Sequence, residues 1–276
     1  MSDGIAVDFG LTGRGCAVTG ASRGIGRAAA RALCAEGAKV LLVARTGERL
    51  LEAADDCAGA GEEAGGQAES LACDVGKPEA AGRIVAEAEQ RFGQLDVLVN
   101  SAGTARWRDL DQIPDEDWYA AWELNVMAPM RLMRAAVPAM RERGWGRVVN
   151  VSSSAGKRPS AAMAEYSVAK AAELSLSRLY ADRCAPDGVL VNAICPGPVK
   201  SDLWMEPGGL LDQSKEMGGY ESREQALEAA GAGRPIGRLA EVEEIAGAIA
   251  FLCSEHASYV AGAAWSVDGG TVRVII

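Results

Sequence analysis

Short apolar runs alternate with longer amphipathic segments along most of this 276-residue chain. The run Leu95-Asp-Val-Leu-Val99, flanked by Gly93 and Asn100, is typical of a strand that is buried on both faces of a sheet. Such runs predict strands near residues 15–19, 39–43, 68–72, 95–99, 147–151, 188–193 and 263–267. The amphipathic segments predict helices near 24–36, 47–63, 78–92, 115–142, 161–185 and 241–253.

The alternation of strands and helices predicts the fold class. Strands separated by helices of this length form a parallel sheet with helices on both faces. We therefore expect one α/β domain over residues 1–276, built on a doubly wound Rossmann sheet. Only residues 200–238 interrupt the rhythm, because many glycines and prolines surround a weak helical segment there. Long irregular segments in compact domains are commonly functional, and we expect this one to be a substrate lid.

Composition and charge exclude several classes of function. The formal net charge of −10 argues against nucleic acid or an anionic membrane surface as the main partner. No apolar run approaches the ~18 residues of a membrane span, and the N-terminus lacks the basic start of a signal peptide. Seven scattered cysteines without a Cys-x-x-Cys pair predict reduced thiols, no metal site and a cytoplasmic protein.

A glycine-rich turn, Thr19-Gly20-Ala-Ser-Arg-Gly24-Ile-Gly26, follows the first predicted strand and opens the first predicted helix. Backbone N–H groups free of side chains, in front of a helix N-terminus, bind the phosphates of a dinucleotide. The same letters also match the nucleophile elbow of hydrolases, with Ser22 and the single histidine, His256. The elbow normally follows a strand in the middle of the sheet, so its place after the first strand argues against a hydrolase.

The second predicted strand indicates which dinucleotide the turn would hold. Its end, Leu42-Val43-Ala44-Arg45-Thr46, has no carboxylate to bind the ribose 2′-hydroxyl of NAD. Arg23 in the turn and Arg45 are instead placed to hold a 2′-phosphate from two sides. The residues therefore favour NADP(H), and NAD is the less favoured cofactor.

A second constellation can move a proton. Tyr166 and Lys170 are at positions i and i+4, so they share one face of a predicted helix. A phenol with a pKa near 10 is a poor acid or base at neutral pH. An ammonium group about 4 Å away favours the phenolate by roughly 4 kcal/mol at an effective dielectric of ~20. Ser153, just after a predicted strand, is placed to donate a hydrogen bond to a substrate carbonyl oxygen.

With these motifs in view, the chain from Leu11 to about Gly270 resembles a single-domain short-chain dehydrogenase/reductase. The resemblance implies that Tyr166 exchanges the proton, Lys170 holds the nicotinamide ribose, Ser153 orients the carbonyl, and Asn125 anchors a water relay. It also implies a homotetramer acting on a small carbonyl or alcohol substrate. Together, the motifs and the resemblance predict cofactor contacts at Gly20, Ser22, Arg23, Gly24, Ile25, Gly26, Arg45, Thr46, Asp74, Val75, Asn100, Ala102, Gly103, Tyr166, Lys170, Pro196, Gly197, Val199 and Ser201.

The substrate is less well indicated. Arg106, Arg108, Lys157 and Arg158 lie in two loops near the expected pocket, where they would attract an anionic substrate or simply face solvent. One alternative is a reductase of 3-oxoacyl groups on acyl carrier protein, although the acidic stretch 181–187 would disfavour docking of that acidic carrier. Another is a protein that senses NADP(H) without turnover.

Overall fold

The computed structural model describes residues 8–45 and 47–273. Its strands form a seven-stranded sheet in the order β3-β2-β1-β4-β5-β6-β7, and every neighbouring pair is parallel. The strands are β1 (Gly15–Thr19), β2 (Lys39–Ala44), β3 (Gln67–Ala72), β4 (Val97–Asn100), β5 (Gly146–Val151), β6 (Val189–Pro196) and β7 (Ala264–Val267). The predicted strands and the doubly wound fold class are thereby confirmed.

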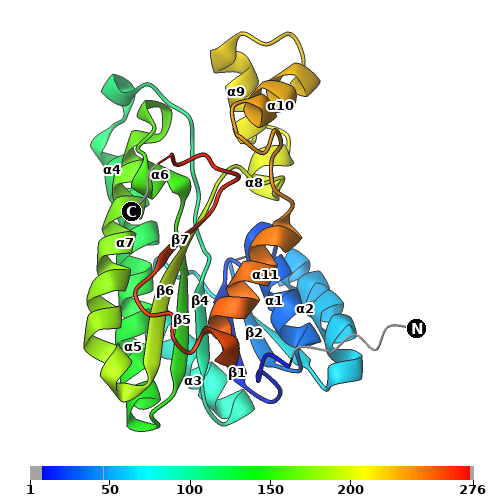
Figure 1. Ribbon diagram of the computed structural model, residues 1–276, viewed down its shortest axis with the longest axis vertical. Coiled ribbons are helices and arrows are strands. Elements are labelled where there is room, and N and C mark those ends of the chain that lie inside the picture. The colour runs from blue at the N-terminus through cyan, green and yellow to red at the C-terminus, as the bar shows by residue number, and fades with distance from the viewer. Residues whose placement is uncertain (1–7, 46, 274–276) are drawn as a thin grey trace.

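The helices lie in two layers, with α1, α2 and α11 on one face of the sheet and α3, α5 and α7 on the other (Figure 1). The helices are α1 (Gly24–Ala35), α2 (Gly47–Gly61), α3 (Ala80–Phe92), α4 (Asp115–Trp122), α5 (Ala128–Glu142), α6 (Ser154–Lys157), α7 (Ala164–Cys184), α8 (Asp202–Met205), α9 (Leu210–Gly218), α10 (Arg223–Ala232) and α11 (Val242–Cys253).

Alternation along the strands explains why both faces are covered. In β2, Val40 and Leu42 pack into the core under α1, α2 and α11, whereas Leu41 and Val43 pack into the core under α3 and α5. Successive side chains of a strand point to opposite faces, so a strand that is apolar throughout must be buried on both. The chain reverses its direction along the sheet between β1 and β4, and crevices at such switch points are where α/β folds bind ligands.

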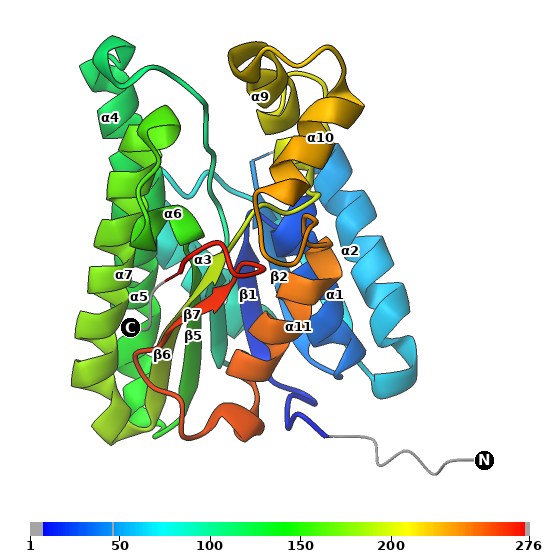
Figure 2. The same cartoon turned by 45° about the horizontal axis from the view of Figure 1, so that its top comes forward.

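Two predicted segments differ from the structure. Residues 200–238 hold three helices, α8, α9 and α10, and Trp204 and Leu210 of this segment pack in a small apolar cluster with Leu239, which directly follows it. In Figures 1 and 2, α9 and α10 stand beyond the carboxyl ends of the strands. The predicted helix 115–142 is interrupted by a π-helical segment, Glu123–Met127. Apolar periodicity does not identify the π-helical segment, because a one-residue bulge leaves the pattern nearly unchanged. The helices of residues 200–238 are short and separated by glycines and prolines, so their periodicity is weak.

Cysteines, metal ligands and long apolar helices are the features that the composition drew attention to. All seven cysteines are buried and free. No group of three or more His, Cys, Asp or Glu side chains that would suit a metal ion occurs in residues 8–45 and 47–273. No described helix combines the length and hydrophobicity that a membrane span requires.

Gly188, before β6, allows two loops to meet at the amino-terminal edge of the sheet. Its φ is +76°, and a Cβ there would lie 2.1 Å from the carbonyl oxygen of Gly144. We expect Gly188→Ala to lower the free energy of unfolding by about 2–4 kcal/mol, measured by urea denaturation. Gly82→Ala, in α3 with open space around its Cβ, is the matched control and should raise stability by about 0.5–1 kcal/mol. Equal losses in both variants would contradict this explanation.

Candidate active site

A cavity of about 1260 Å³ opens at the carboxyl edge of the sheet, where it is bordered by residues of the 200–238 segment. Among the predicted site residues, those lining it are Gly20, Ser22, Arg23, Gly24, Ile25, Gly26, Arg45, Asp74, Val75, Ala102, Gly103, Ser153, Tyr166, Lys170, Pro196, Gly197, Val199 and Ser201. Asn100 and Asn125 are buried and do not line this cavity. Thr46 lies outside the described residues. The structure thus brings together nearly all positions that the sequence assigned.

The glycines of the turn are required by close backbone approaches. Gly20 has a φ of +67°, and a Cβ there would lie 2.8 Å from Cα of Ala102. A Cβ on Gly26 would lie 2.4 Å from the carbonyl oxygen of Gly20. Thr19 Oγ1 accepts hydrogen bonds from the N–H groups of Ser101 (3.0 Å) and Ala102 (3.2 Å). The turn after β1 is therefore fixed against the loop after β4, on one side of the cavity.

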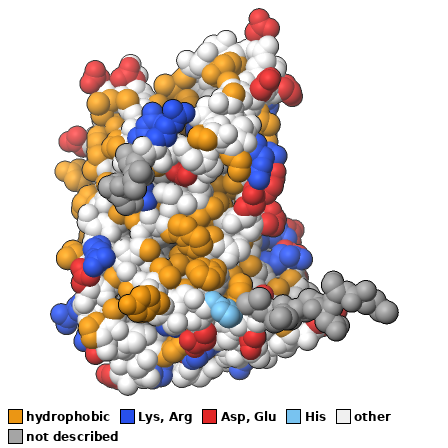
Figure 3. Space-filling model, in the orientation of Figure 1, with side chains coloured by type: hydrophobic (Ala, Val, Ile, Leu, Met, Phe, Trp, Pro, Cys, Tyr) orange, Lys and Arg blue, Asp and Glu red, His pale blue; other side chains and the backbone are white. Residues whose placement is uncertain are grey.

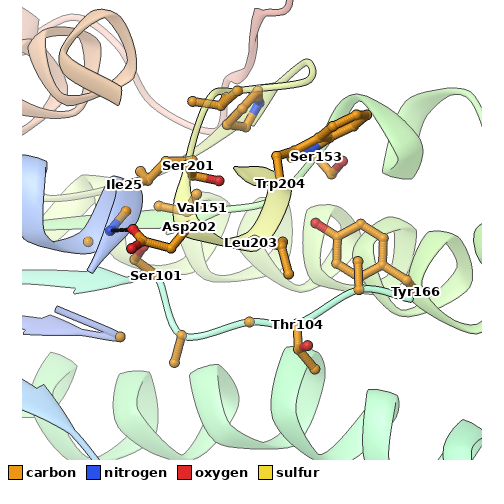
Figure 4. A pocket seen from close by; sticks show the side chains of 18 of the residues that line it. Ile25, Ser101, Thr104, Val151, Ser153, Tyr166, Ser201, Asp202, Leu203 and Trp204 are labelled. Carbon is orange, nitrogen blue, oxygen red and sulfur yellow. Dashed lines mark hydrogen bonds between the residues drawn. The ribbon is translucent and has the colours of Figure 1, made fainter. Parts of the chain in front are cut away.

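An aspartate from α8 occupies the mouth of the turn. Oδ2 of Asp202 accepts a hydrogen bond of 2.8 Å from the N–H of Gly24, the first residue of α1 (Figure 4). This N–H belongs to the helix terminus that has no partner within the helix. The contact shows that the turn presents a donor suited to an anionic oxygen.

Two arginines beside the turn share one carboxylate. Arg23 and Arg49 both form ion pairs with Glu206, which follows α8, and the Arg49 distance is 2.6 Å. The hydrogen bond from Arg49, together with the charge of Arg23, lowers the pKa of Glu206. Arg45 is exposed and also lines the cavity. Sequence reasoning missed Arg49, because it lies within the first turns of α2, where an arginine is typical of a solvated surface.

Ser153 and Tyr166 come from different elements and line the same cavity (Figure 4). Ser153 is the N-cap of α6, and its Oγ accepts a hydrogen bond of 3.1 Å from the N–H of Ala155. An accepting hydroxyl still has its proton to donate, so the cap orients Oγ while leaving its O–H available. Tyr166 stands in the first turns of α7.

Lys170 is held by two partners inside the protein. Its ammonium Nζ donates to the carbonyl oxygen of Val151 at 2.7 Å and to Oε2 of Glu173 at 2.9 Å. It lies 5.8 Å from the ring centroid of Tyr166. The side chains of Lys170 and Glu173 are almost fully buried, at 3% and 1% exposure. An ammonium group has three protons, so one remains for the cavity.

The surroundings act on both members of this pair. Burial alone would lower the pKa of Lys170, but the charges of Glu173 and Tyr166 and the hydrogen bond to Glu173 raise it above its ordinary value. Burial raises the pKa of Glu173, while the Lys170 ammonium opposes that rise. Glu173 therefore keeps the buried lysine charged. Sequence reasoning missed Glu173, because a Lys and Glu three residues apart is an ordinary surface pair on a helix.

Asn125 lies in the π-helical segment behind the cavity. Its Nδ2 donates to the carbonyl oxygen of Ala121 at 2.9 Å, whereas its buried Oδ1 has no hydrogen-bond partner. A Cβ placed on Gly103 would lie 3.4 Å from this Oδ1 and 4.0 Å from Nζ of Lys170. The amide oxygen and the ammonium thus face the same small space beside Gly103. A buried unpaired acceptor near an ammonium is a suitable place for a bridging water.

The four loop cations predicted to attract an anion have different environments. Arg108 forms an ion pair with Asp117, and Lys157 donates to Oγ of Ser266 at 2.9 Å. Arg106 borders a neighbouring depression outside the main cavity. Only Arg158 lines the cavity with Ser153 and Tyr166.

The structure also separates the two residues of the hydrolase alternative. His256 Nε2 contacts the carbonyl oxygen of Asp8 at 2.9 Å, and the neighbouring Glu255 bonds to Arg14, which precedes β1. Ser22 follows the opposite, carboxyl end of β1 and lines the cavity. A serine and a histidine at opposite ends of one strand cannot form a nucleophile–base pair.

Known proteins resemble this chain over nearly its whole length. The family model described as "Enoyl-(Acyl carrier protein) reductase" matches residues 20–272. The short-chain reductase protein NovJ of Streptomyces niveus is 37% identical over 92% of this chain and 92% of its own length. The 3-oxoacyl-[acyl-carrier-protein] reductase FabG of Escherichia coli is 34% identical over 93% of this chain and 96% of its own.

Solved structures agree with these relatives. L-sorbose reductase from Gluconobacter frateurii, complexed with NADPH and L-sorbose, is 36% identical and superposes with a TM-score of 0.88 over 98% of this chain and 100% of its own. Levodione reductase superposes with a TM-score of 0.87 at 27% identity, over 96% and 99%. With the family model and the sequence relatives, this likeness shows that the chain belongs to the short-chain dehydrogenase/reductase family.

Proposed function

We propose that this oxidoreductase transfers a hydride between NADP(H) and a carbonyl/alcohol pair, with Tyr166 exchanging the proton. One observation carries the proposal: Ser153, Tyr166 and Lys170 line the same cavity as the glycine-rich turn. A dinucleotide held by that turn would extend toward these three side chains. Relatives whose names describe reductases, one of them solved with NADPH, support the same reaction class.

The residues of the turn fit a dinucleotide. The backbone approaches at Gly20 and Gly26 leave no room for side chains, and the N–H of Gly24 already donates to a carboxylate. An anionic phosphate oxygen can take the place of that carboxylate. Asp74 and Val75, after β3, line the cavity and would contact the adenine. When the dinucleotide is bound, its nicotinamide ring would supply or accept the hydride.

The chain's own residues perform the proton chemistry. In carbonyl reduction, the hydroxyl of Tyr166 would donate its proton to the oxygen that gains negative charge, while Ser153 Oγ–H holds that oxygen. The Lys170 ammonium would stabilise the resulting phenolate by its charge. The space between Asn125 Oδ1 and Lys170 would hold a water that returns a proton to the site.

The arginines around the turn support a preference for NADP(H). Arg23, Arg45 and Arg49 all line the cavity beside the end of β2. Guanidinium groups bind phosphate bidentately, and no carboxylate stands at the end of that strand to select a free ribose hydroxyl. In this interpretation, a 2′-phosphate would replace Glu206 as the anion between Arg23 and Arg49.

A second candidate is the reduction of 3-oxoacyl groups on acyl carrier protein, the activity in the name of the Escherichia coli relative. The acidic residues near the end of α7 are paired, Asp182 with Arg178 and Asp187 with Arg141.

The single domain, the lid role of residues 200–238, the cytoplasmic location and the homotetramer stay predictions. Exposed Val168 and Leu179 on α7 would suit the subunit contact that a homotetramer needs.

Tyr166→Phe removes the proton donor and keeps the ring. We expect kcat for NADPH-dependent ketone reduction to fall by about 100- to 10,000-fold, with NADPH affinity retained, measured by absorbance loss and by fluorescence titration. Tyr119 is 73% exposed on α4, so Tyr119→Phe is the control, and its kcat should be unchanged. Tight NADPH binding with no turnover of any carbonyl by the unmodified protein would instead favour the sensing alternative.

Lys170→Met leaves Glu173 buried without its counter-ion, and we expect it to lower the free energy of unfolding by about 3–5 kcal/mol. The double variant Lys170→Met/Glu173→Leu should lose much less free energy of unfolding than the sum of the losses in the two single variants. Burial raises the pKa of Glu173. A carboxyl group whose pKa is higher in the folded than in the unfolded protein stabilises the folded state in acid. This contribution is lost as the pH rises through the folded-state pKa. The deficit of Lys170→Met should therefore be larger near pH 8 than near pH 5 in urea denaturation, and additive losses would contradict the pairing.

Glu206→Gln removes the anion that now neutralises Arg23 and Arg49. We expect its affinity for NADPH to rise several-fold while its affinity for NADH stays constant, measured by nicotinamide fluorescence. Arg49→Met should weaken NADPH binding about 10- to 100-fold, the loss of one charge-assisted hydrogen bond. Glu216 is exposed on α9, so Glu216→Gln is the control and should change neither cofactor affinity. Equal affinity of the unmodified protein for both cofactors would overturn the role of these arginines.

A further inference from the structure

Two arginines without carboxylate partners stand near the catalytic side chains. Arg158 follows α6, Arg234 follows α10, and both line the cavity that holds Ser153 and Tyr166. In Figure 3, a group of Lys and Arg side chains lies on the face between the α6–α7 side and the α9–α10 lobe. The chain as a whole is acidic, with a net charge of −10, so a local excess of positive charge needs an explanation.

The hydrogen bonds of the two guanidinium groups are with main-chain carbonyl oxygens. Arg158 Nη1 is 3.4 Å from the carbonyl oxygen of Thr271, and Arg234 Nη1 donates to the carbonyl oxygen of Ala230. Nε of Arg234 is buried and has no hydrogen-bond partner. Within residues 8–45 and 47–273, neither guanidinium forms an ion pair with a carboxylate, whereas Arg108, the neighbouring loop cation, is paired with Asp117.

The two positive charges act on each other. Burial lowers the pKa of Arg234, and the charge of Arg158 lowers it further. Guanidinium groups stay protonated in proteins, so the pair persists as two like charges in a partly dry cavity. Such an arrangement is costly unless an anion joins it. The missing anion can be a ligand.

The cofactor is not the best source of that anion. Its phosphates fit the turn at Gly24 and the arginines Arg23 and Arg49, which come from α1, α2 and the residues just before α1. Arg158 instead ends the short helix whose N-cap is Ser153. Five residues of helix span about 7 Å, so the backbone places Arg158 close enough to Ser153 for one small ligand to reach both side chains.

The cavity that holds these side chains also has an apolar lining. Trp107, Met163, Trp204 and Leu210 line the same cavity, and the rings of Trp107 and Trp204 meet edge to face with centroids 6.5 Å apart. A ligand that packs against these apolar side chains needs an apolar body. It would have a carbonyl at one end and an anionic group at the other.

We propose that Arg158 and Arg234 form a carboxylate-binding subsite, so that the substrates are oxo acids, or the matching hydroxy acids, with an apolar chain between the two groups. This rests on the proposed function for the reaction at the carbonyl. Of the loop cations that suggested an anionic substrate, only Arg158 takes part. Its partner comes from the 200–238 segment, and the sequence did not single it out.

The test uses 6-oxoheptanoate and its primary amide, which has nearly the same shape but no charge. We expect the unmodified protein with NADPH to have a kcat/KM at least about tenfold higher for the acid than for the amide. Arg158→Met and Arg234→Met should each abolish this preference, mainly by raising KM for the acid, and leave the amide unchanged. Arg106→Met, outside the main cavity, is the matched control and should keep the preference.

Further measurements separate this subsite from the cofactor site and from the reaction. NADPH affinity should be unchanged in Arg158→Met and Arg234→Met, and a loss there would assign the arginines to the cofactor and overturn the proposal. Calorimetric titration of the NADPH-loaded Tyr166→Phe variant with acid and amide tests binding without turnover. Preferential binding of the acid, abolished by Arg234→Met, supports the subsite even if no ketone is reduced. Reduction of both ketones with equal kcat/KM overturns the subsite and leaves the proposed function standing.

Discussion

One buried ammonium group links the parts on which the site depends. Lys170 of α7 donates to the carbonyl oxygen of Val151 at the end of β5 and to the carboxylate of Glu173. It therefore ties the helix that carries Tyr166 to the strand that ends before Ser153. Burial of a lone charge is costly, so Glu173 is what allows the cation to remain charged there. The position of the tyrosine relative to the serine therefore depends on the hydrogen bond from Lys170 to Val151, and Glu173 keeps that donor charged.

The sheet explains why residues so far apart in sequence meet. All of its strands are parallel, so the ends of β1, β3, β4, β5 and β6 reach the same edge. The glycine-rich turn directly follows β1, and Ser153 is the second residue after β5. Backbone geometry at that edge, rather than surface complementarity, therefore fixes the distances between the dinucleotide-binding side and the proton-transfer side. The 200–238 segment then borders the same edge, where Trp204 and Leu210 pack with Leu239 in a small apolar cluster.

The sequence predicted most of this arrangement, because periodicity and glycine placement reflect constraints of the backbone. Val97–Asn100 and the other strands follow from apolar runs that must be buried on both faces. The π-helical segment around Asn125, the carboxylate of Glu173 and the guanidinium groups of Arg49 and Arg234 were not predicted. The role of each of these features depends on the contacts and the burial that its side chains acquire in the folded protein. A charged residue on an amphipathic helix has the same sequence signature whether it faces solvent or a neighbour.

The short helix α8 carries Asp202 against the N–H of Gly24, and Glu206 at its end pairs with Arg23 and Arg49. These are the donors that the phosphate groups of the proposed cofactor would use, so binding of that cofactor would exchange one set of anions for another. Asp202 is the first residue of α8 and Glu206 directly follows this helix, so a movement of α8 would displace both carboxylates. Occupancy of the nucleotide side would then be sensed directly by the segment that borders the substrate side, with no separate relay between them.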